Sequence, residues 1–314
     1  MNDENFIWCE KYRPKTIEDT ILPSHLKTMF LEFIKKRNVP NLLLVGTAGI
    51  GKTTVAKALL NELDSDYIVI NGSMDNGIDI LRTKISNFAS SVSFAGGRKY
   101  VILDEADYLV AKSTQPALRN FIEENSKNCG FILTCNYKNK IIEPLHSRCT
   151  VIDFKIPKSD MQGIVTQFFR RSLQILDAEN VTYDKAAVAK LVQTYYPDWR
   201  RTINELQRYS ATGHIDEGIL VNTSENVIMS LLDLMKAKDF TGVRRWLAEN
   251  SDMDSSELYD KLYSILPGKL SDTQSVAGMI VVLAEYQYKE AFVANSEINR
   301  AAAMATLMAE MSWK

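Results

Sequence analysis

One short segment of the sequence has the residue types and the spacing of a phosphate-binding loop. It reads GTAGIGKT from Gly46 to Thr53 and lies between an apolar stretch and an amphipathic one. Glycines let such a loop curl so that backbone N–H groups point at phosphate oxygens, and the following helix adds the positive end of its dipole. Lys52 is then placed to reach the β- and γ-phosphates, and the Thr53 hydroxyl can ligate Mg²⁺. The segment therefore predicts a nucleoside triphosphate site.

Two adjacent acids supply the second half of that chemistry. Asp104 and Glu105 end the apolar run that begins at Tyr100. An acid at the carboxyl end of a buried strand lies beside the phosphate loop in sheets of this kind. Asp104 can hold Mg²⁺, directly or through water, and Glu105 can orient or deprotonate the attacking water. A structural role is the weaker interpretation, because neighbouring buried carboxylates repel each other without a cation.

The stretches around these residues predict an α/β fold. Apolar runs that read as buried strands alternate with amphipathic helices as far as 150–154. Unbroken apolar strands with intervening helices indicate a P-loop parallel sheet that helices cover on both faces. After residue 155 only helical patterns follow, and a glycine-containing linker lies near Gly213. We expect a nucleotide-binding domain at 1–155, a small helical domain at 156–218 and an all-helical domain at 219–314.

Composition restricts the class of protein. The chain has 314 residues, 46% hydrophobic and 24% charged, with a net charge of −2, the balance of a soluble globular protein. A generally basic surface is excluded, so any nucleic-acid contact must use a local patch. No apolar run is long enough to cross a membrane, and the N-terminus is too polar for a secretion signal. We expect a cytoplasmic protein.

Metal binding by cysteine is not expected. The sequence has no CxxC pair, and its histidines are scattered. We therefore predict no zinc site and interpret the thiols as reduced groups in or near the core. The cysteines are Cys9, Cys129, Cys135 and Cys149.

The letters DEAD, from Asp104 to Asp107, also raise a helicase interpretation. A helicase of that class grips nucleic acid between two RecA-like sheets. This sequence has strand patterns for one sheet only, and its second half is helical. The match is therefore interpreted as incidental.

The order of several motifs resembles a known family. WCEKYRP from Trp8, the phosphate loop, DEAD, TCN from Thr134, SRC from Ser147 and PDWRR from Pro197 follow one another. This order resembles the clamp-loader ATPases of the AAA+ class, including the eukaryotic replication factor C subunits. The length and the plain helical C-terminal part are most similar to the large subunit of T4-type phage clamp loaders. The motifs span about residues 6–210, and the four-cysteine zinc module of bacterial clamp-loader motor subunits is absent from the sequence.

The resemblance assigns roles to residues around the nucleotide. It implies that Asn136 senses the γ-phosphate and that Arg148 is an arginine finger acting in the site of a neighbouring subunit. Arg200 is implied as a second sensor from the helical lid at 156–218, with Arg201 as the competing assignment. With the phosphate loop, the segment around YRP completes the implied ATP-binding set. That set is Cys9, Glu10, Lys11, Tyr12, Arg13, Ile21, Thr47, Ala48, Gly49, Ile50, Gly51, Lys52, Thr53, Thr54 and Arg200.

DNA contacts are implied on one helix. Arg82 and Lys84 flank an apolar stripe in a segment similar to the clamp-loader helix that faces the ring's central channel. They would meet phosphates of primer–template DNA, although solvated charges beside a core stripe are an alternative for each residue. Gln115 and Arg119 match a coupling segment of the family, whereas Asn120 replaces its second arginine. The clamp-contacting face is expected near 80–125.

The sequence as a whole predicts an ATP- and Mg²⁺-dependent motor subunit of a sliding-clamp loader. Its expected partners are other subunits in a ring, with 219–314 as the collar, the DNA polymerase sliding clamp and primer–template DNA. One alternative is another AAA+ machine, such as a branch-migration helicase or a replication initiator. A second alternative, a non-hydrolysing ATP-binding scaffold, is disfavoured because Lys52, Glu105 and Arg148 are all present.

Overall fold

The computed structural model describes residues 6–75, 77–92, 98–126, 128–211, 213–216, 224–251 and 253–313. The chain divides into two compact units, residues 1–216 and 217–314. The expected boundary between 218 and 219 lies outside the described residues. The domain limits at 155, 218 and 219 therefore stay predictions, and each unit is described by itself.

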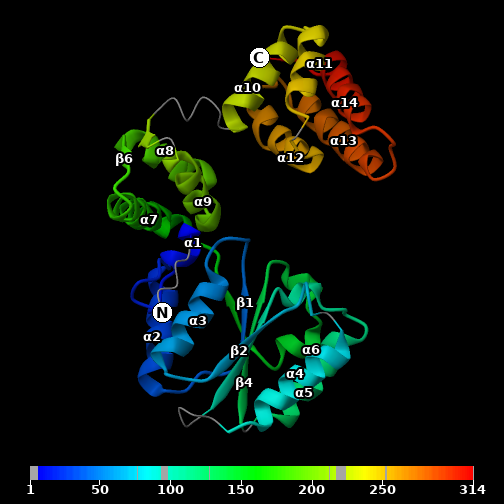
Figure 1. Cartoon of the computed structure of the whole chain (residues 1–314). Helices are drawn as coiled ribbons and strands as arrows, with labels where there is room; N and C mark the ends of the chain where they lie inside the picture. Colours follow the sequence, from blue (N-terminus) through cyan, green and yellow to red (C-terminus); the bar gives the residue numbers. More distant parts are fainter. Residues whose placement is uncertain are drawn as a thin grey trace. The chain divides into compact units, whose positions relative to one another are not determined.

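A parallel sheet forms the centre of the first unit (Figure 1). Its strand order is β2-β3-β4-β1-β5. The strands are β1 (Leu42–Val45), β2 (Tyr67–Asn71), β3 (Lys99–Asp104), β4 (Cys129–Cys135) and β5 (Thr150–Asp153). Every pairing in this sheet is parallel, and Val45 is in register with both Cys135 and Asp153. The segments that follow β1, β3 and β4 therefore start from the same edge of the sheet, which is where the predicted site residues lie.

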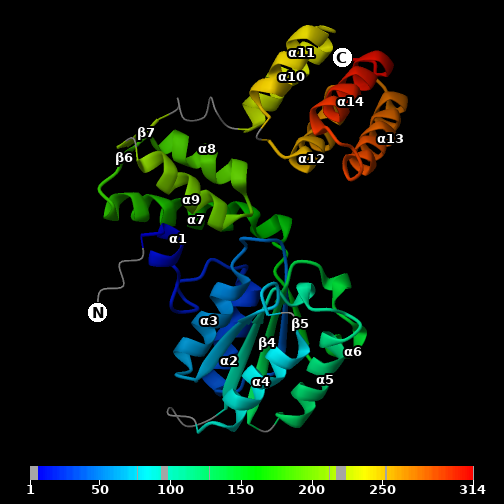
Figure 2. The same cartoon turned by 45° about the vertical axis from the view of Figure 1, so that its right-hand side comes forward.

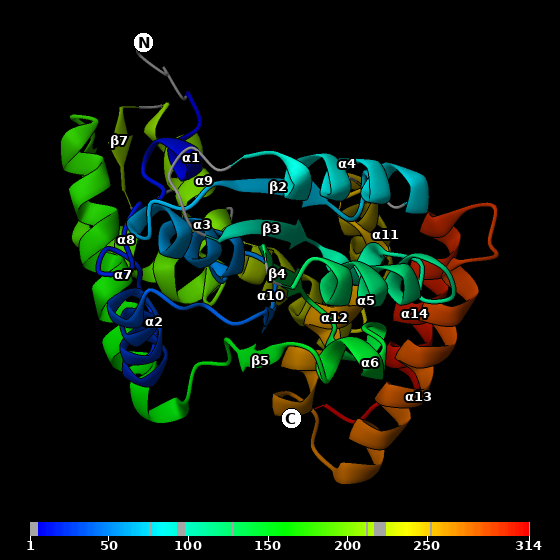
Figure 3. The same ribbon diagram turned by 90° about the horizontal axis from the view of Figure 1, so that it is seen from below.

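Helices cover both faces of this sheet (Figure 3). In β1, Leu42 and Leu44 belong to one hydrophobic core, and Leu43 and Val45 belong to the other. This alternation is the two-residue repeat of a strand that is buried on both faces. On one side lie α2 (Ser24–Lys36) and α3 (Lys52–Glu62), and on the other lie α4 (Ile78–Ser90), α5 (Thr114–Glu124) and α6 (Glu143–His146). The predicted α/β fold class is confirmed.

A small helical bundle follows the sheet within the first unit. It consists of α7 (Lys158–Ala178), α8 (Lys185–Tyr195) and α9 (Trp199–Ser210), with β6 (Thr182–Tyr183) paired to β7 (His214–Ile215). The rings of Phe168 and Trp199 stack with centroids 4.2 Å apart in its core. Tyr196 packs edge-on against Trp199 at 5.5 Å. These contacts fix the start of α9, the helix that carries Arg200.

The N-terminal helix α1 (Trp8–Lys11) is hydrogen-bonded to this bundle. The Trp8 backbone N–H donates to Oε1 of Gln207 at 2.9 Å, and Nε2 of Gln207 donates to the Phe6 carbonyl at 2.6 Å. The Tyr12 hydroxyl donates to Oε1 of Glu179 at 2.5 Å. The segment before the sheet thus bonds to α9 and to the end of α7, although the sequence assigned it to the nucleotide-binding domain.

The second unit is built from helices around one hydrophobic core (Figure 2). Its helices are α10 (Ser224–Lys236), α11 (Phe240–Glu249), α12 (Ser255–Ile265), α13 (Thr273–Glu290) and α14 (Ser296–Glu310). Asp or Asn side chains cap the N-termini of α11 to α14 by accepting backbone N–H bonds, and this stabilises those helix starts. The core includes Trp246, Tyr259, Leu283 and Leu307.

The cysteines are all free. Burial raises the pKa of the Cys129 thiol to about 11 and that of Cys135 and Cys149 to about 12. These three residues therefore act as small apolar groups of the core. In the part of the chain that the structure describes, no helix has both the length and the apolar character needed to span a membrane.

Candidate nucleotide-binding site

The phosphate loop connects β1 to α3 and adopts a backbone that suits glycine. Gly49 has a φ of 72° and Gly51 a φ of 103°, values that other residues rarely adopt. A Cβ atom on Gly49 would lie 1.7 Å from Oδ1 of Asp198, the residue that caps α9. Gly49 is thus required both by the turn and by the close approach of the helical bundle. The free N–H groups at the start of α3 are the donors that suit a phosphate.

Lys52 is held at the centre of this site. Its Nζ donates to the carbonyls of Gly46 and Thr47 and to Oδ1 of Asn136, each at 2.8 Å. The residue is 7% exposed, and burial lowers the pKa of its amine while Asp104 and Asp107 act in the opposite direction. The structure therefore brings together the loop lysine and the predicted sensor, which are separated by 84 positions in the chain.

The predicted metal ligands are in direct contact. Oδ1 of Asp104 accepts a hydrogen bond from the Thr53 hydroxyl and one from the Thr134 hydroxyl, both at 2.6 Å. A carboxylate and a hydroxyl beside a phosphate loop are the oxygen donors that Mg²⁺ prefers, so these residues fit that ion. Thr134 was not identified from the sequence, where it is one threonine within an apolar strand.

Glu105 turns away from the strand that carries Asp104. Its φ is 55°, in the left-handed region that costs energy for a residue with a Cβ atom. Its N–H donates to the Thr134 hydroxyl at 3.1 Å, and its carbonyl lies where a Cβ on Gly72 would clash, at 2.6 Å. The backbone of this acid is therefore fixed by its neighbours in β4 and after β2.

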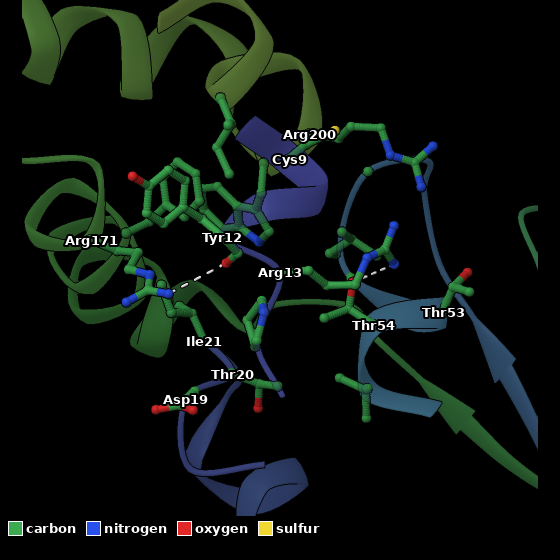
Figure 4. A pocket seen from close by; sticks show the side chains of 18 of the residues that line it. Cys9, Tyr12, Arg13, Asp19, Thr20, Ile21, Thr53, Thr54, Arg171 and Arg200 are labelled. Atoms are coloured by element: carbon green, nitrogen blue, oxygen red, sulfur yellow. Dashed lines mark hydrogen bonds between the residues drawn. The ribbon is translucent and has the colours of Figure 1, made fainter. Parts of the chain in front are cut away.

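A pocket opens beside the phosphate loop, toward the helical bundle (Figure 4). Many of the residues in the implied ATP-binding set line it. They are Cys9, Tyr12, Arg13, Ile21, Gly49, Ile50, Gly51, Lys52, Thr53, Thr54 and Arg200. Nη1 of Arg13 donates to the Thr54 hydroxyl at 3.3 Å, and Nη2 of Arg171 donates to the Tyr12 carbonyl at 3.3 Å. The lining combines apolar and aromatic side chains with polar and charged ones, and the apolar and aromatic groups suit a purine base.

Four members of the implied set do not line this pocket among the described residues: Glu10, Lys11, Thr47 and Ala48. Glu10 is hydrogen-bonded to Arg13, which lowers the pKa of that carboxyl group. Lys11 donates to Glu179 at 2.6 Å.

The helical bundle also contributes lining residues that were not identified from the sequence. They are Phe168, Arg171, Ile175, Trp199 and Ile203. They are spread over α7 and α9, where their spacing indicates only a helix core.

The two adjacent arginines of α9 occupy different surroundings. Arg200 lines the pocket. The guanidinium carbon of Arg201 lies 4.9 Å from the ring centroid of Tyr195, a cation–π contact on the helical bundle.

Arg148 lies beside α5 and α6, which cover the face of the sheet opposite to α2 and α3. Its Nε donates to Oε1 of Glu123 on α5 at 2.8 Å, and its Nη2 donates to the same oxygen. Nη1 donates to the Pro144 carbonyl at 2.9 Å. In the described part of the chain, none of its hydrogen bonds involves the phosphate loop.

The residues implied in DNA contact lie on an exposed side of α4. The guanidinium carbon of Arg82 lies 5.9 Å from the ring centroid of Phe121, and Lys84 donates to Asp75 at 2.6 Å.

Gln115, which matches the coupling segment of the family, is fully buried. Its amide donates to the carbonyls of Leu109 and Lys140 at 3.0 and 2.9 Å and accepts from the Ile142 N–H at 2.8 Å.

Comparisons with known proteins identify the family of this chain. A family model described as the AAA+ ATPase lid domain of the sliding-clamp-loader large subunit matches residues 160–221. A model of the ATPase family associated with various cellular activities matches residues 42–156. The sliding-clamp-loader large subunit of Enterobacteria phage T4 is 37% identical over 100% of this chain and 99% of its own. This chain belongs to the AAA+ family of sliding-clamp-loader large subunits.

Other relatives are consistent with that assignment. The sliding-clamp-loader large subunit of Escherichia phage RB69 is 35% identical over 100% of this chain and 99% of its own. A replication factor C small subunit from Archaeoglobus fulgidus is 34% identical over 82% of this chain and 79% of its own. The resemblance inferred from the sequence is confirmed, and the chain is an AAA+ ATP hydrolase. The alternative of another AAA+ machine is less supported.

Solved structures agree at the level of the fold. A RuvB variant from Thermotoga maritima matches with a TM-score of 0.54, covering 83% of this chain and 93% of its own. The two sequences are 17% identical. At that identity the likeness shows an AAA+ fold and carries no argument about activity.

Proposed function

We propose that this chain is the motor subunit of a loader that opens a DNA polymerase sliding clamp and places it on primer–template DNA. The observation that carries the proposal is full-length similarity to phage clamp-loader large subunits, together with a site in which Lys52, Asn136, Thr53 and Asp104 meet. We place the protein in a ring with other subunits, with residues 219–314 as the collar that joins them.

The chain's own residues perform the ATP chemistry in this proposal. Lys52 binds the β- and γ-phosphates, exchanging its bonds to the loop carbonyls for phosphate oxygens. Thr53 and Asp104 hold Mg²⁺, which neutralises charge on the phosphates when bound. Glu105 orients the attacking water and accepts its proton. Asn136 hydrogen-bonds the γ-phosphate or that water.

The residues of the pocket hold the base and report on the phosphates. Cys9, Tyr12, Arg13 and Ile21 surround the adenine, and the backbone from Glu10 to Lys11 and from Thr47 to Thr54 completes the nucleotide contacts. Arg200 reaches the γ-phosphate from the start of α9, because it lines the pocket whereas Arg201 lies over Tyr195. ATP then favours the arrangement in which the lid is closed.

Arg148 acts in the site of the adjacent subunit. A guanidinium there stabilises the charge that develops on the transferred phosphoryl group. Arg82 and Lys84 contact the DNA backbone. Each subunit offers few charges, but a ring repeats them along the duplex, which reconciles DNA binding with a net charge of −2.

ATPase measurements test the proposal. We expect weak hydrolysis by the assembled complex alone and strong stimulation only when primed DNA and the clamp are both present. Glu105→Gln is the control, since it keeps the site's shape and removes the base. Stimulation by long single-stranded or branched DNA without a clamp would contradict clamp loading and favour a helicase.

A further inference from the structure

Asp107 is a buried acid that has no role in the chemistry above. It lies in the single-turn helix η1 (Ala106–Tyr108), one residue after the strand that carries Asp104, and is 7% exposed. Its Oδ2 accepts the backbone N–H groups of Asn136 at 3.2 Å and of Tyr137 at 3.3 Å. These are the first two residues after β4. One carboxylate oxygen of Asp107 therefore fixes the backbone position of Asn136, the proposed sensor.

The other carboxylate oxygen, Oδ1, is buried and has no hydrogen-bond partner among the described residues. Burying a carboxylate with an unpaired oxygen costs free energy. A neutral amide oxygen in the same place could accept the same two N–H groups at a lower cost of desolvation. The charge is therefore not explained by these two bonds alone.

Lys52 supplies the missing explanation. Its amine donates to Oδ1 of Asn136 at 2.8 Å; burial lowers the pKa of this amine, and the charge of Asp107 acts in the opposite direction. The carboxylate thus acts on the lysine in two ways, through the backbone that mounts Asn136 and through its field. Both actions converge on the group that is proposed to bind the γ-phosphate.

We propose that Asp107 is a positioning residue that aims the Asn136 carboxamide at Lys52 and the γ-phosphate. The inference rests on the proposed function, because it takes Asn136 as the sensor and Lys52 as the phosphate-binding cation. It assigns the last acid of DEAD to the backbone after β4 and not to the nucleotide itself.

Two substitutions separate charge from hydrogen bonding. Asp107→Ala removes both, and we expect kcat for ATP to fall about 10- to 100-fold, the range for losing bonds to a charged acceptor. Asp107→Asn keeps an acceptor oxygen but loses the charge that acts on Lys52, so we expect a smaller loss, about 3- to 10-fold. KM and the binding of a fluorescent ATP analogue should change less than about threefold in both variants.

A double substitution tests whether the effect passes through the sensor. When Asn136→Ala is already present, we expect Asp107→Ala to reduce kcat only by the part that its field on Lys52 carries, no more than the loss in Asp107→Asn alone. Multiplied effects of the two substitutions would overturn the inference, as would a folded Asp107→Ala variant with unchanged kcat. If the alanine variant does not fold, Asp107→Asn is measured in its place with thermal unfolding alongside, and an unchanged kcat in that variant would overturn the inference.

A matched control loses a similar bond elsewhere. Asp184 accepts the Ala186 N–H at 2.8 Å at the start of α8, so Asp184→Ala should lower thermal stability and leave kcat unchanged. The complete complex with clamp and primed DNA is used throughout. If the unsubstituted complex does not hydrolyse ATP, the proposed function itself fails; if it does and the double substitution is multiplicative, the inference about Asp107 fails alone.

Discussion

Lys52 and Arg148 are proposed to act on the same kind of phosphate, and the chain holds them in opposite ways. Lys52 is 7% exposed and bonds to two loop carbonyls and to Asn136. The Arg148 side chain is 29% exposed and is paired with Glu123, whose side chain is 53% exposed. A cation that acts within its own chain can be built into the core. One that acts in a neighbouring chain has to stay at the surface.

The difference has an energetic consequence. Bonds between buried groups are costly to break unless a new partner replaces them, so we expect Lys52 to leave its acceptors only when phosphate oxygens arrive. An exposed ion pair contributes little, because water and salt screen it. In the proposed ring, Arg148 would therefore exchange Glu123 for a phosphate at small cost when subunits meet.

The largest expected effect comes from the surface cation. We expect Arg148→Ala to lower the clamp- and DNA-stimulated rate about 10³-fold or more, because it removes charge stabilisation of the transition state. ATP binding to the same subunit should be unchanged, as measured with a fluorescent analogue. Mixing this variant with Glu105→Gln subunits should restore part of the activity, and no rescue at any mixing ratio would contradict action between chains.

Substitution of the buried cation, Lys52, should affect ATP binding as well as hydrolysis. We expect Lys52→Ala to weaken both ATP binding and hydrolysis, the latter by about 10²- to 10³-fold, because its charge is used in its own site. Lys36→Ala, at the exposed end of α2, is the control and should retain activity. Tight ATP binding by Lys52→Ala would remove the contrast between the two cations.

The adjacent arginines of α9 sharpen the comparison within the lid. We expect Arg200→Ala to raise KM for ATP about 10-fold, the effect of losing a charged contact to phosphate. Arg201→Ala should leave KM within about twofold, since its guanidinium lies over the Tyr195 ring. Steady-state kinetics of both variants, side by side, measure this. The reverse order would reassign the sensor to Arg201.

The smallest effect is expected from the partner of the surface cation. Glu123→Gln weakens a pair that is already screened by solvent, so the stimulated rate should change by less than about threefold. The thermal unfolding temperature should hardly move. A loss as large as that of Arg148→Ala would show that Glu123 belongs to the shared site and is not an exchangeable partner.

Much of the fold was accessible from the sequence because its signals are local. The apolar run at 42–45, the glycines up to Gly51 and the acids after Tyr100 each carry their information within a few residues. A parallel sheet then places the ends of its strands at one edge, which is why the phosphate loop and Asp104 were expected together. The family followed from the order of motifs, and comparison confirmed it.

The remainder of the site is made by contacts between distant segments, which no local pattern encodes. Only in the folded chain does Thr134 hydrogen-bond to Asp104, and Asp107 accept the backbone N–H of Asn136. Folding also brings Phe168 and Trp199 to the lining of the pocket. The sequence by itself determined which residue types were available and in which order the strands and motifs follow one another. Tertiary structure decided which buried polar atoms became partners, because a buried donor or acceptor has to find its counterpart in whatever segment packs against it.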